Sequence, residues 1–349
     1  MRSPSGPGNG GRSSPGNSRR NFTQCTSRAM TLFLSPVGLE RLPKRSGQLP
    51  MKSKPVSKWE LTLWGNHSRQ TTITLQVLLR ARVPVRCLVL AGQIRQPGTN
   101  RRIPLAVWNE DVAVIAARHA IPVVHVPARS TLFELCGDER ISADLGVISC
   151  FPWKIDSHLV RLYPFGMINI HPSLLPDFRG PSPLFWQYHD GRLRGGITLH
   201  WVTDELDGGP IIDQVTCDIP LGFPGDRLEA WLAWYGTSRL VEILGRNTLP
   251  AGWFPTRLGS WAPVPDDAAC LLDTSWPAWR AAHFLNGVLP LGYPVSIRDH
   301  EGRVWIVRRC LGWSSRPTLS AETVESLLTL SLQGGTLTVL AEHRSITGA

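Results

Sequence analysis

Short apolar runs alternate with helix-patterned stretches from Trp59 onward, and this alternation constrains the fold more than any other feature. Such alternation is typical of an α/β domain built on a mostly parallel sheet. Strands are expected over 59–64, 85–90, 122–126, 145–150, 167–171, 196–202 and 211–219. Helices are expected over 68–81, 104–119 and 225–244.

Composition divides the chain into four parts. Residues 1–58 are rich in Gly, Pro, Ser and Arg and are expected to form a disordered basic tail. Residues 59–247 are the expected α/β domain, and the Pro-, Gly- and Trp-rich residues 248–273 are a linker. Residues 274–349 contain one helical pattern and several β-like runs, which predict a small β-rich, barrel-like domain of the OB type.

The net charge of +10 lies entirely in the tail. Residues 1–58 hold 11 Lys and Arg against Glu40 alone, whereas the rest of the chain holds 26 basic and 26 acidic residues. The charge is therefore no evidence that the folded body binds nucleic acid. The tail resembles an organelle transit peptide in its charge, but Pro and Gly break the amphipathic helix that such peptides need. A true start at Met30 or Met51 is the alternative interpretation.

Three classes of protein are disfavoured. No apolar run reaches the roughly 18 residues of a membrane span. The seven cysteines are odd in number, scattered and without a C-x-x-C pair, which argues against a disulfide framework or structural zinc and suits the reducing cytoplasm. The first strand is not followed by G-x-G-x-x-G, and no phosphate-binding P-loop motif occurs, so neither a nucleotide-dependent Rossmann enzyme nor a P-loop NTPase is expected.

The residues most capable of chemistry lie between 169 and 209. Asn169 and His171 end an expected strand two positions apart, so they face the same side at the sheet edge where α/β proteins bind ligands. A later strand runs into an acidic loop that ends in Asp207 and two glycines. Amide, imidazole and carboxylate are the groups needed for acyl transfer to an amine. The amide can hold the developing oxyanion, the imidazole can move a proton, and the carboxylate can orient the imidazole and raise its pKa.

Simpler interpretations of these residues compete with catalysis. A histidine that ends a strand is more often a structural hydrogen-bonding group, and Asp204 and its neighbours also suit a solvated turn. A metal site from His200, Asp204 and Asp207 is disfavoured, because a strand-to-loop transition does not fix the ligand spacing.

The ordered motifs N-x-H-P-S-L-L-P, F-R-G-x-x-P, G-x-T-x-H and L-D-G-G resemble the 10-formyltetrahydrofolate-dependent formyltransferases over roughly residues 59–245. The resemblance implies a Rossmann-like formyltransferase domain that uses 10-formyltetrahydrofolate as co-substrate and no metal. It implies that Asn169 binds the formyl oxygen and that His171 assists proton transfer and stabilises the intermediate. Asp207 would keep His171 charged or order a water, with Asp204 as the second candidate for this acid.

The same resemblance implies a pterin site walled by loops, here 150–155 and 202–209. Phe151 and Trp153 are either the wall of that site or plain core. The implied co-substrate contacts are Phe151, Trp153, Ser173, Val202, Asp204 and Gly208.

Within the family the sequence is most similar to the enzymes that formylate initiator methionyl-tRNA in protein biosynthesis. This similarity rests on S-L-L-P-x-F-R-G-P-S-P at 173–183, a polar insertion at 93–102, and W-P-A…F-L-N-G at 276–287. It implies tRNA as a partner, although the insertion is equally interpreted as an ordinary solvated loop. The oligomeric state is not set by the sequence. The implied tRNA contacts are Arg95, Arg101, Arg102 and Arg179.

Other features favour a different acceptor. The L-D-G-G loop is similar to that of the purine-pathway enzymes, and the first strand ends in W-G-N-H-S instead of G-T-P-E-F. The alternatives are N-formylation of a sugar amine or of glycinamide ribonucleotide, and hydrolysis of the co-substrate. A binding module without catalysis is disfavoured, because Asn169, His171 and Asp207 are all present.

Overall fold

The computed structural model describes most of the chain after its N-terminal tail. The expected tail lies outside the described residues, except for 57–58 and the backbone of Thr23–Gln24. The insertion that carries Arg95, Arg101 and Arg102 lies outside them as well. Among the helices that the structure describes, none combines the length and apolar character needed to cross a membrane. The described ranges are 23–24, 57–92, 111–246, 248–299, 301–315 and 327–343.

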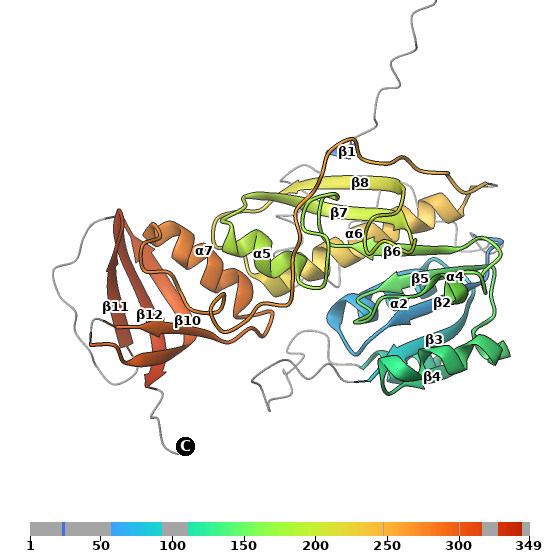
Figure 1. Cartoon of the computed structure of the whole chain (residues 1–349), viewed down its shortest axis with the longest axis horizontal. Coiled ribbons are helices and arrows are strands. Elements are labelled where there is room, and N and C mark those ends of the chain that lie inside the picture. Colours follow the sequence, from blue (N-terminus) through green and yellow to red (C-terminus); the bar gives the residue numbers. More distant parts are fainter. Residues whose placement is uncertain are drawn as a thin grey trace, which may run out of the picture.

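An eight-stranded, mostly parallel sheet forms the larger lobe of the molecule (Figure 1). Its strands are β1 (Thr23–Gln24), β2 (Leu61–Gly65), β3 (Val85–Ala91), β4 (Val123–Val126), β5 (Leu145–Ser149), β6 (Met167–His171), β7 (Arg194–Trp201) and β8 (Ile211–Asp218). Their order in space is β1-β8-β7-β6-β5-β2-β3-β4. Strand β7 runs antiparallel to β6 and β8, and the other neighbours are parallel. The predicted α/β fold class is confirmed, and each expected strand is present within two residues of its bounds.

Helices flank this sheet, and polar side chains cap several of them. They are α2 (Arg69–Arg80), α3 (Val112–Arg118), α4 (Ser157–Val160), α5 (Pro183–His189), α6 (Gly225–Leu244) and the 3-10 helices η1 (Arg129–Gly137) and η2 (Glu139–Ile141). The Ser68 hydroxyl and the Asp111 carboxylate accept N–H groups that the first turns of α2 and α3 leave without a partner. The helices expected over 68–81 and 225–244 are confirmed, whereas α5 has no counterpart among the predicted elements.

The smaller lobe contains one helix and a second sheet. Its elements are α7 (Ala278–Val288), β9 (Val295–Arg298), β10 (Val304–Ser314), β11 (Leu327–Leu332) and β12 (Gly335–His343). All neighbouring strands are antiparallel, in the order β11-β12-β10-β9. A small β-rich C-terminal part is therefore confirmed. The described residues pair as an open four-stranded sheet, and closure into a barrel of the OB type stays a prediction.

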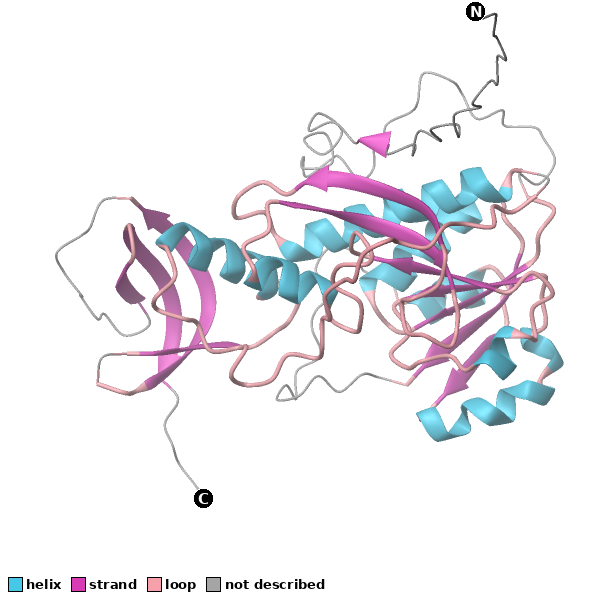
Figure 2. Cartoon of the chain, turned by 45° about the horizontal axis from the view of Figure 1, so that its top comes forward, coloured by secondary structure: helices cyan, strands magenta, loops and turns pink. Residues whose placement is uncertain are grey.

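A continuous hydrophobic core joins the two lobes. Helix α7 packs against α5, and Figure 2 shows both helices lying between the two sheets. The ring of Phe185 lies 5.6 Å from that of Phe284 and 4.9 Å from that of Tyr293, measured between centroids. The division into 59–247 and 274–349 stays a proposal, because one cluster of buried apolar residues runs through both parts.

A substitution at Gly287 on α7 tests how tightly the junction between the two lobes is packed. A Cβ at this position would overlap the buried ring of Tyr188, whose hydroxyl is held by the Phe223 carbonyl. We expect Gly287→Ala to lower the free energy of unfolding by about 1–3 kcal/mol through overpacking, although alanine is the better helix former. Chemical denaturation measures this loss. Gly137→Ala is the control, since a Cβ at Gly137 meets nothing within 4 Å, and equal stability of the two variants would contradict the packing described.

Candidate active site

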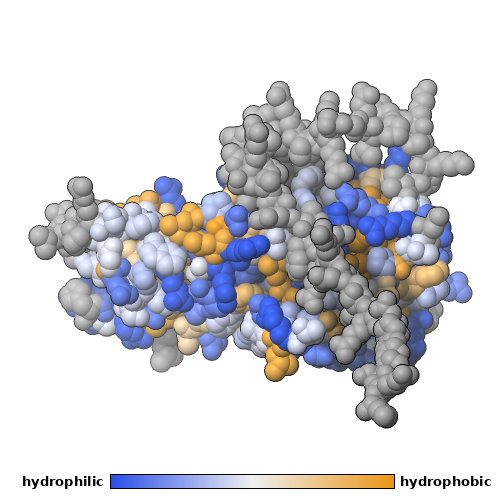
Figure 3. Space-filling view, turned by 90° about the horizontal axis from the view of Figure 1, so that it is seen from above, coloured by the Kyte–Doolittle hydropathy of each residue, from blue (hydrophilic) through white to orange (hydrophobic). Residues whose placement is uncertain are grey.

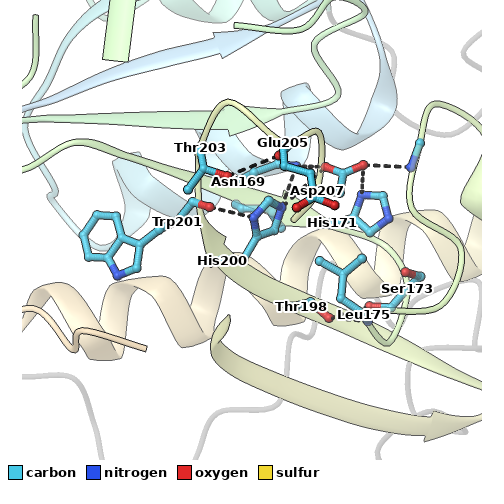
Figure 4. Close-up of polar contacts among 12 residues, drawn as sticks. Asn169, His171, Ser173, Leu175, Thr198, His200, Trp201, Thr203, Glu205 and Asp207 are labelled. Carbon is cyan, nitrogen blue, oxygen red and sulfur yellow. Dashed lines mark hydrogen bonds and ion pairs between the residues drawn. The ribbon is translucent and has the colours of Figure 1, made fainter. Parts of the chain in front are cut away.

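Four polar side chains from three segments meet at one edge of the sheet. Asn169 and His171 come from the end of β6, His200 comes from β7, and Asp207 comes from the loop after β7. Asn169 and His200 are direct partners in the antiparallel β6–β7 pairing. Figure 4 shows their side chains turned toward one another, with the Asp207 carboxylate between the two histidines. The structure therefore brings together the three side chains that the sequence singled out, and adds His200.

The Asp207 carboxylate is the centre of this cluster. Its Oδ1 accepts a hydrogen bond from Asn169 Nδ2 at 3.1 Å, and its Oδ2 accepts one from the Gly180 N–H at 2.8 Å. His171 Nδ1 lies 3.7 Å from Oδ2, and His200 Nε2 lies 3.5 Å from Oδ1. One buried carboxylate thus contacts the amide, both imidazoles and a loop backbone.

Backbone carbonyls fix the tautomers of both histidines. His171 Nε2 lies 2.8 Å from the Phe178 carbonyl, and His200 Nδ1 lies 2.9 Å from the Trp201 carbonyl. Because a carbonyl only accepts, each of these nitrogens carries a hydrogen. In the neutral state, Nδ1 of His171 is therefore a free acceptor that faces Asp207. Nε2 of His200 accepts from Asn169 Nδ2 at 3.1 Å.

Both amide hydrogens of Asn169 are engaged inside the cluster. One is donated to Asp207 and the other to His200. A ligand oxygen that accepts a hydrogen bond from this amide must therefore displace either Asp207 or His200 as the acceptor. Asn169 is half-buried, whereas His171, His200 and Asp207 are almost completely buried, so Asn169 is the member of the cluster most accessible from solvent.

Burial and charge set the protonation states. Burial lowers the pKa of His171 below its ordinary value of 6.5; His200 adds to this effect, and Asp207 opposes it. Burial by itself would raise the pKa of Asp207, but His171, His200 and the Gly180 N–H more than offset it and hold that pKa well below the usual range. At neutral pH the cluster is therefore a carboxylate beside a neutral imidazole. The lowered pKa of His171 favours the neutral imidazole, and the expectation that Asp207 keeps His171 charged or orders a water stays a prediction.

The loops around the cluster adopt backbone conformations that few residues tolerate. Asp207, Phe178 and Cys150 all have positive φ, at 51°, 58° and 61°. Non-glycine residues rarely adopt this region, and such strain gathers at functional sites. At Gly209 a Cβ would overlap the Trp201 carbonyl oxygen, so the second glycine of L-D-G-G allows the loop to approach β7.

Comparison with known proteins agrees with this geometry. The family described as formyl transferase matches residues 138–242. Residues 138–242 thus form a formyl transferase domain. Its relatives include methionyl-tRNA formyltransferase of Syntrophus aciditrophicus, 29% identical over 62% of this chain and 69% of that protein. They also include the mitochondrial methionyl-tRNA formyltransferase of Homo sapiens, 33% identical over 42% of this chain and 40% of that protein.

Solved structures of low sequence identity share the fold of this chain. The N-formyltransferase of Helicobacter canadensis in complex with folinic acid and dTDP-3-aminofucose aligns with a TM-score of 0.58 at 14% identity, over 81% of this chain and 99% of that chain. HypX of Aquifex aeolicus aligns with a TM-score of 0.56 at 12% identity, over 81% of this chain and 45% of that chain. At these identities the likeness concerns the fold alone.

Five of the six expected co-substrate contacts fall into two groups. Phe151, Trp153 and Val202 are half-buried and pack against a hydrophobic cluster behind the loops, so the two aromatic residues are anchored in the core and also partly exposed. Asp204 is exposed and Gly208 is half-buried in the loop that ends at the glycine pair. Within the described ranges, no group of three His, Cys, Asp or Glu is placed to hold a metal ion.

Ser173 differs from that expectation. Its side chain is fully buried, and its hydroxyl donates to the Asp177 carbonyl at 2.7 Å. Its own carbonyl accepts from the Thr198 hydroxyl at 2.6 Å. Ser173 therefore shapes the turn after β6, and a direct contact between its side chain and a ligand is not available in this conformation.

Arg179 lies beside the cluster and forms an ion pair with Glu205 of the loop after β7. This pair ties the F-R-G segment to the loop that carries Asp207. The other arginines expected to contact tRNA lie outside the described residues, so that expectation stays a prediction.

His200 is the site residue that the sequence did not identify as functional. Its position opposite Asn169 depends on β6 and β7 being antiparallel neighbours in this register. The only available signal was the alternation in G-x-T-x-H, which places Thr198 and His200 on the same side of β7.

The lowered pKa of His171 predicts a dependence of stability on pH. Below pH 6.5 the unfolded chain binds a proton at this histidine before the folded chain does, so the free energy of unfolding falls as the pH decreases. Denaturant titrations at pH 7.5 and 5.5 measure the loss. We expect the free energy of unfolding to fall less in His171→Asn than in the wild type. Burial also lowers the pKa of His283, which contributes an equal loss to both proteins. Equal losses in the two proteins would contradict a neutral, buried His171.

Proposed function

We propose that this formyltransferase transfers the formyl group of 10-formyltetrahydrofolate to the amine of initiator methionyl-tRNA. The observation that carries the proposal is the convergence of Asn169, His171 and Asp207 on one edge of the sheet in a formyltransferase fold. The names of the relatives support the acceptor. This chain spans 69% of the Syntrophus aciditrophicus protein but 50% or less of two other relatives, including that of Pseudothermotoga lettingae, which is 31% identical.

The residues beside the cluster fit a folate co-substrate. Phe151, Trp153 and Val202 offer partly exposed apolar surface for a flat ring system, and the loop at 203–208 offers polar groups, with Asp204 and Gly208 as proposed contacts. When bound, the co-substrate supplies an activated formyl carbon.

His171 and Asp207 move and stabilise the proton in this proposal. His171 accepts the proton of the attacking amine at Nδ1, since its Nε2–H is already donated to the Phe178 carbonyl. The imidazolium formed in this way is stabilised by the Asp207 carboxylate 3.7 Å away, and it returns the proton to the leaving nitrogen. Asn169 donates an N–H to the formyl oxygen by giving up its bond to His200.

A formate-transfer assay on charged initiator tRNA tests the reaction. We expect His171→Gln and Asp207→Asn each to lower kcat/KM about 10²–10⁴-fold, the range that a positioned acid–base group contributes. His125→Gln is the matched control, because His125 is exposed on β4. Wild-type rates in His171→Gln would contradict the site. Transfer to a nucleotide-sugar amine but not to methionyl-tRNA would contradict the acceptor.

The arginines of the insertion, together with Arg179, are the proposed tRNA contacts. Charge reversal at Arg101 and Arg102 should weaken tRNA binding and lower the slope of log K against log salt by about one for each lost phosphate contact. Binding titrations at several salt concentrations measure this slope. Arg129→Glu, at the exposed start of η1, is the control. An unchanged salt slope in the Arg101 and Arg102 variant would identify the insertion as ordinary solvated surface.

We place the protein in the cytoplasm. The six cysteines within the described residues are all free thiols, which suits a reducing compartment. The human and rat relatives carry the word mitochondrial in their names, so import through the basic tail is the alternative. Mass spectrometry of the natural N-terminus distinguishes the two.

A further inference from the structure

The segment between α6 and α7, expected from composition to be a linker, is built into the active-site region. In Figure 1 this orange segment runs back over the larger lobe before it reaches α7. Trp253 pairs with Ile211 through two backbone hydrogen bonds of 2.7 and 2.9 Å. Several of its large apolar side chains stay exposed, and Figure 3 shows apolar surface interleaved with polar surface on the face seen from above. The end of the segment is anchored in the core by Leu272 and Trp276, whereas the part around Trp253 is held through its backbone.

Its strongest contacts go to the loop at 177–182. The Arg257 guanidinium binds both oxygens of Asp177, at 2.6 and 2.7 Å. The Ser260 hydroxyl accepts from the Phe178 N–H at 2.9 Å, and the Ser260 carbonyl accepts from the Arg179 N–H at 2.9 Å. The Arg179 carbonyl in turn accepts from the Ala262 N–H at 2.6 Å.

The opposite side of the same loop holds the catalytic pair. The Phe178 carbonyl accepts from His171, and the Gly180 N–H donates to Asp207. The Phe178 N–H therefore donates to Ser260, while the Phe178 carbonyl accepts from His171 and fixes its tautomer. Its φ of 58° is a conformation that persists only where the surroundings impose it.

We propose that Ser260 is a positioning residue of the active site, acting through Phe178 and Arg179. Its hydroxyl and carbonyl hold the loop so that the Phe178 carbonyl sets the tautomer of His171 and the Gly180 N–H holds Asp207. Arg257 supports the same loop one residue earlier. The segment that leads to the C-terminal lobe is thereby part of the catalytic apparatus. The kinetic consequence rests on the proposed function, whereas the effect on His171 does not.

Kinetics on the full-length protein test the positioning role. We expect Ser260→Ala to lower kcat for formyl transfer about 10–100-fold, the effect of a displacement of roughly 1 Å, with the KM for the co-substrate unchanged within about twofold. Ser260→Thr keeps the hydroxyl and should restore most of the rate. Ser238→Ala is the matched control, since that hydroxyl bonds the Trp234 carbonyl within α6. An unchanged kcat in Ser260→Ala, or a loss that Ser260→Thr does not restore, would overturn the proposal.

A spectroscopic readout separates this proposal from the proposed function. In ¹⁵N-histidine spectra, His171 is identified by the signals that disappear in His171→Gln. We expect its Nε2–H tautomer in the wild type and a shift toward mixed tautomers in Ser260→Ala. Arg257→Gln, which breaks an exposed ion pair and should leave the fold intact, is expected to shift the same signals less. Unchanged His171 signals in both variants would overturn the positioning role, even in a protein that formylates no tRNA.

Discussion

The buried carboxylate of Asp207 is the interaction on which the rest of the site depends. An ionised group at this depth is tolerated only when hydrogen-bond donors replace the water that it has lost. Asn169 and Gly180 supply N–H groups, and His171 and His200 lie on either side. These groups come from β6, from β7 and from the loop between these strands, so their contacts with the carboxylate fix the relative positions of the three segments.

The same constraint explains the unusual backbone around the site. The loop after β7 must turn Asp207 inward, which it does at positive φ, and Gly209 then lets the chain approach β7 again. The loop after β6 must present a carbonyl to His171 and an N–H to Asp207, which places Phe178 in a left-handed conformation. Strain in both loops is balanced by bonds outside the cluster, including those from Ser260.

Much of the fold could be predicted from the sequence, because it depends on local pattern. The strand ending in Asn169 and His171 was predicted with its observed bounds, since a short apolar run between turn residues leaves little freedom. The convergence on Asp207 followed from the rule that ligands bind at the carboxyl ends of such strands. The family resemblance supplied the roles of these side chains.

The rest depends on contacts that are distant in sequence. The place of His200 follows from the register of β7 against β6, and Ser260 lies 82 residues beyond Phe178, the residue that it holds. The neutrality of His171 follows from burial, which no local pattern records. Helix α5 begins with a proline and is only seven residues long, so its periodicity is too short to recognise.

A titration of His171 followed by ¹⁵N NMR tests most directly whether an ionised Asp207 lies beside a neutral imidazole. The structure predicts a midpoint below 6.5 in the wild type and a still lower midpoint in Asp207→Asn, because the carboxylate is the group that favours the imidazolium. A wild-type midpoint above 6.5, or the same midpoint in both proteins, would contradict this account.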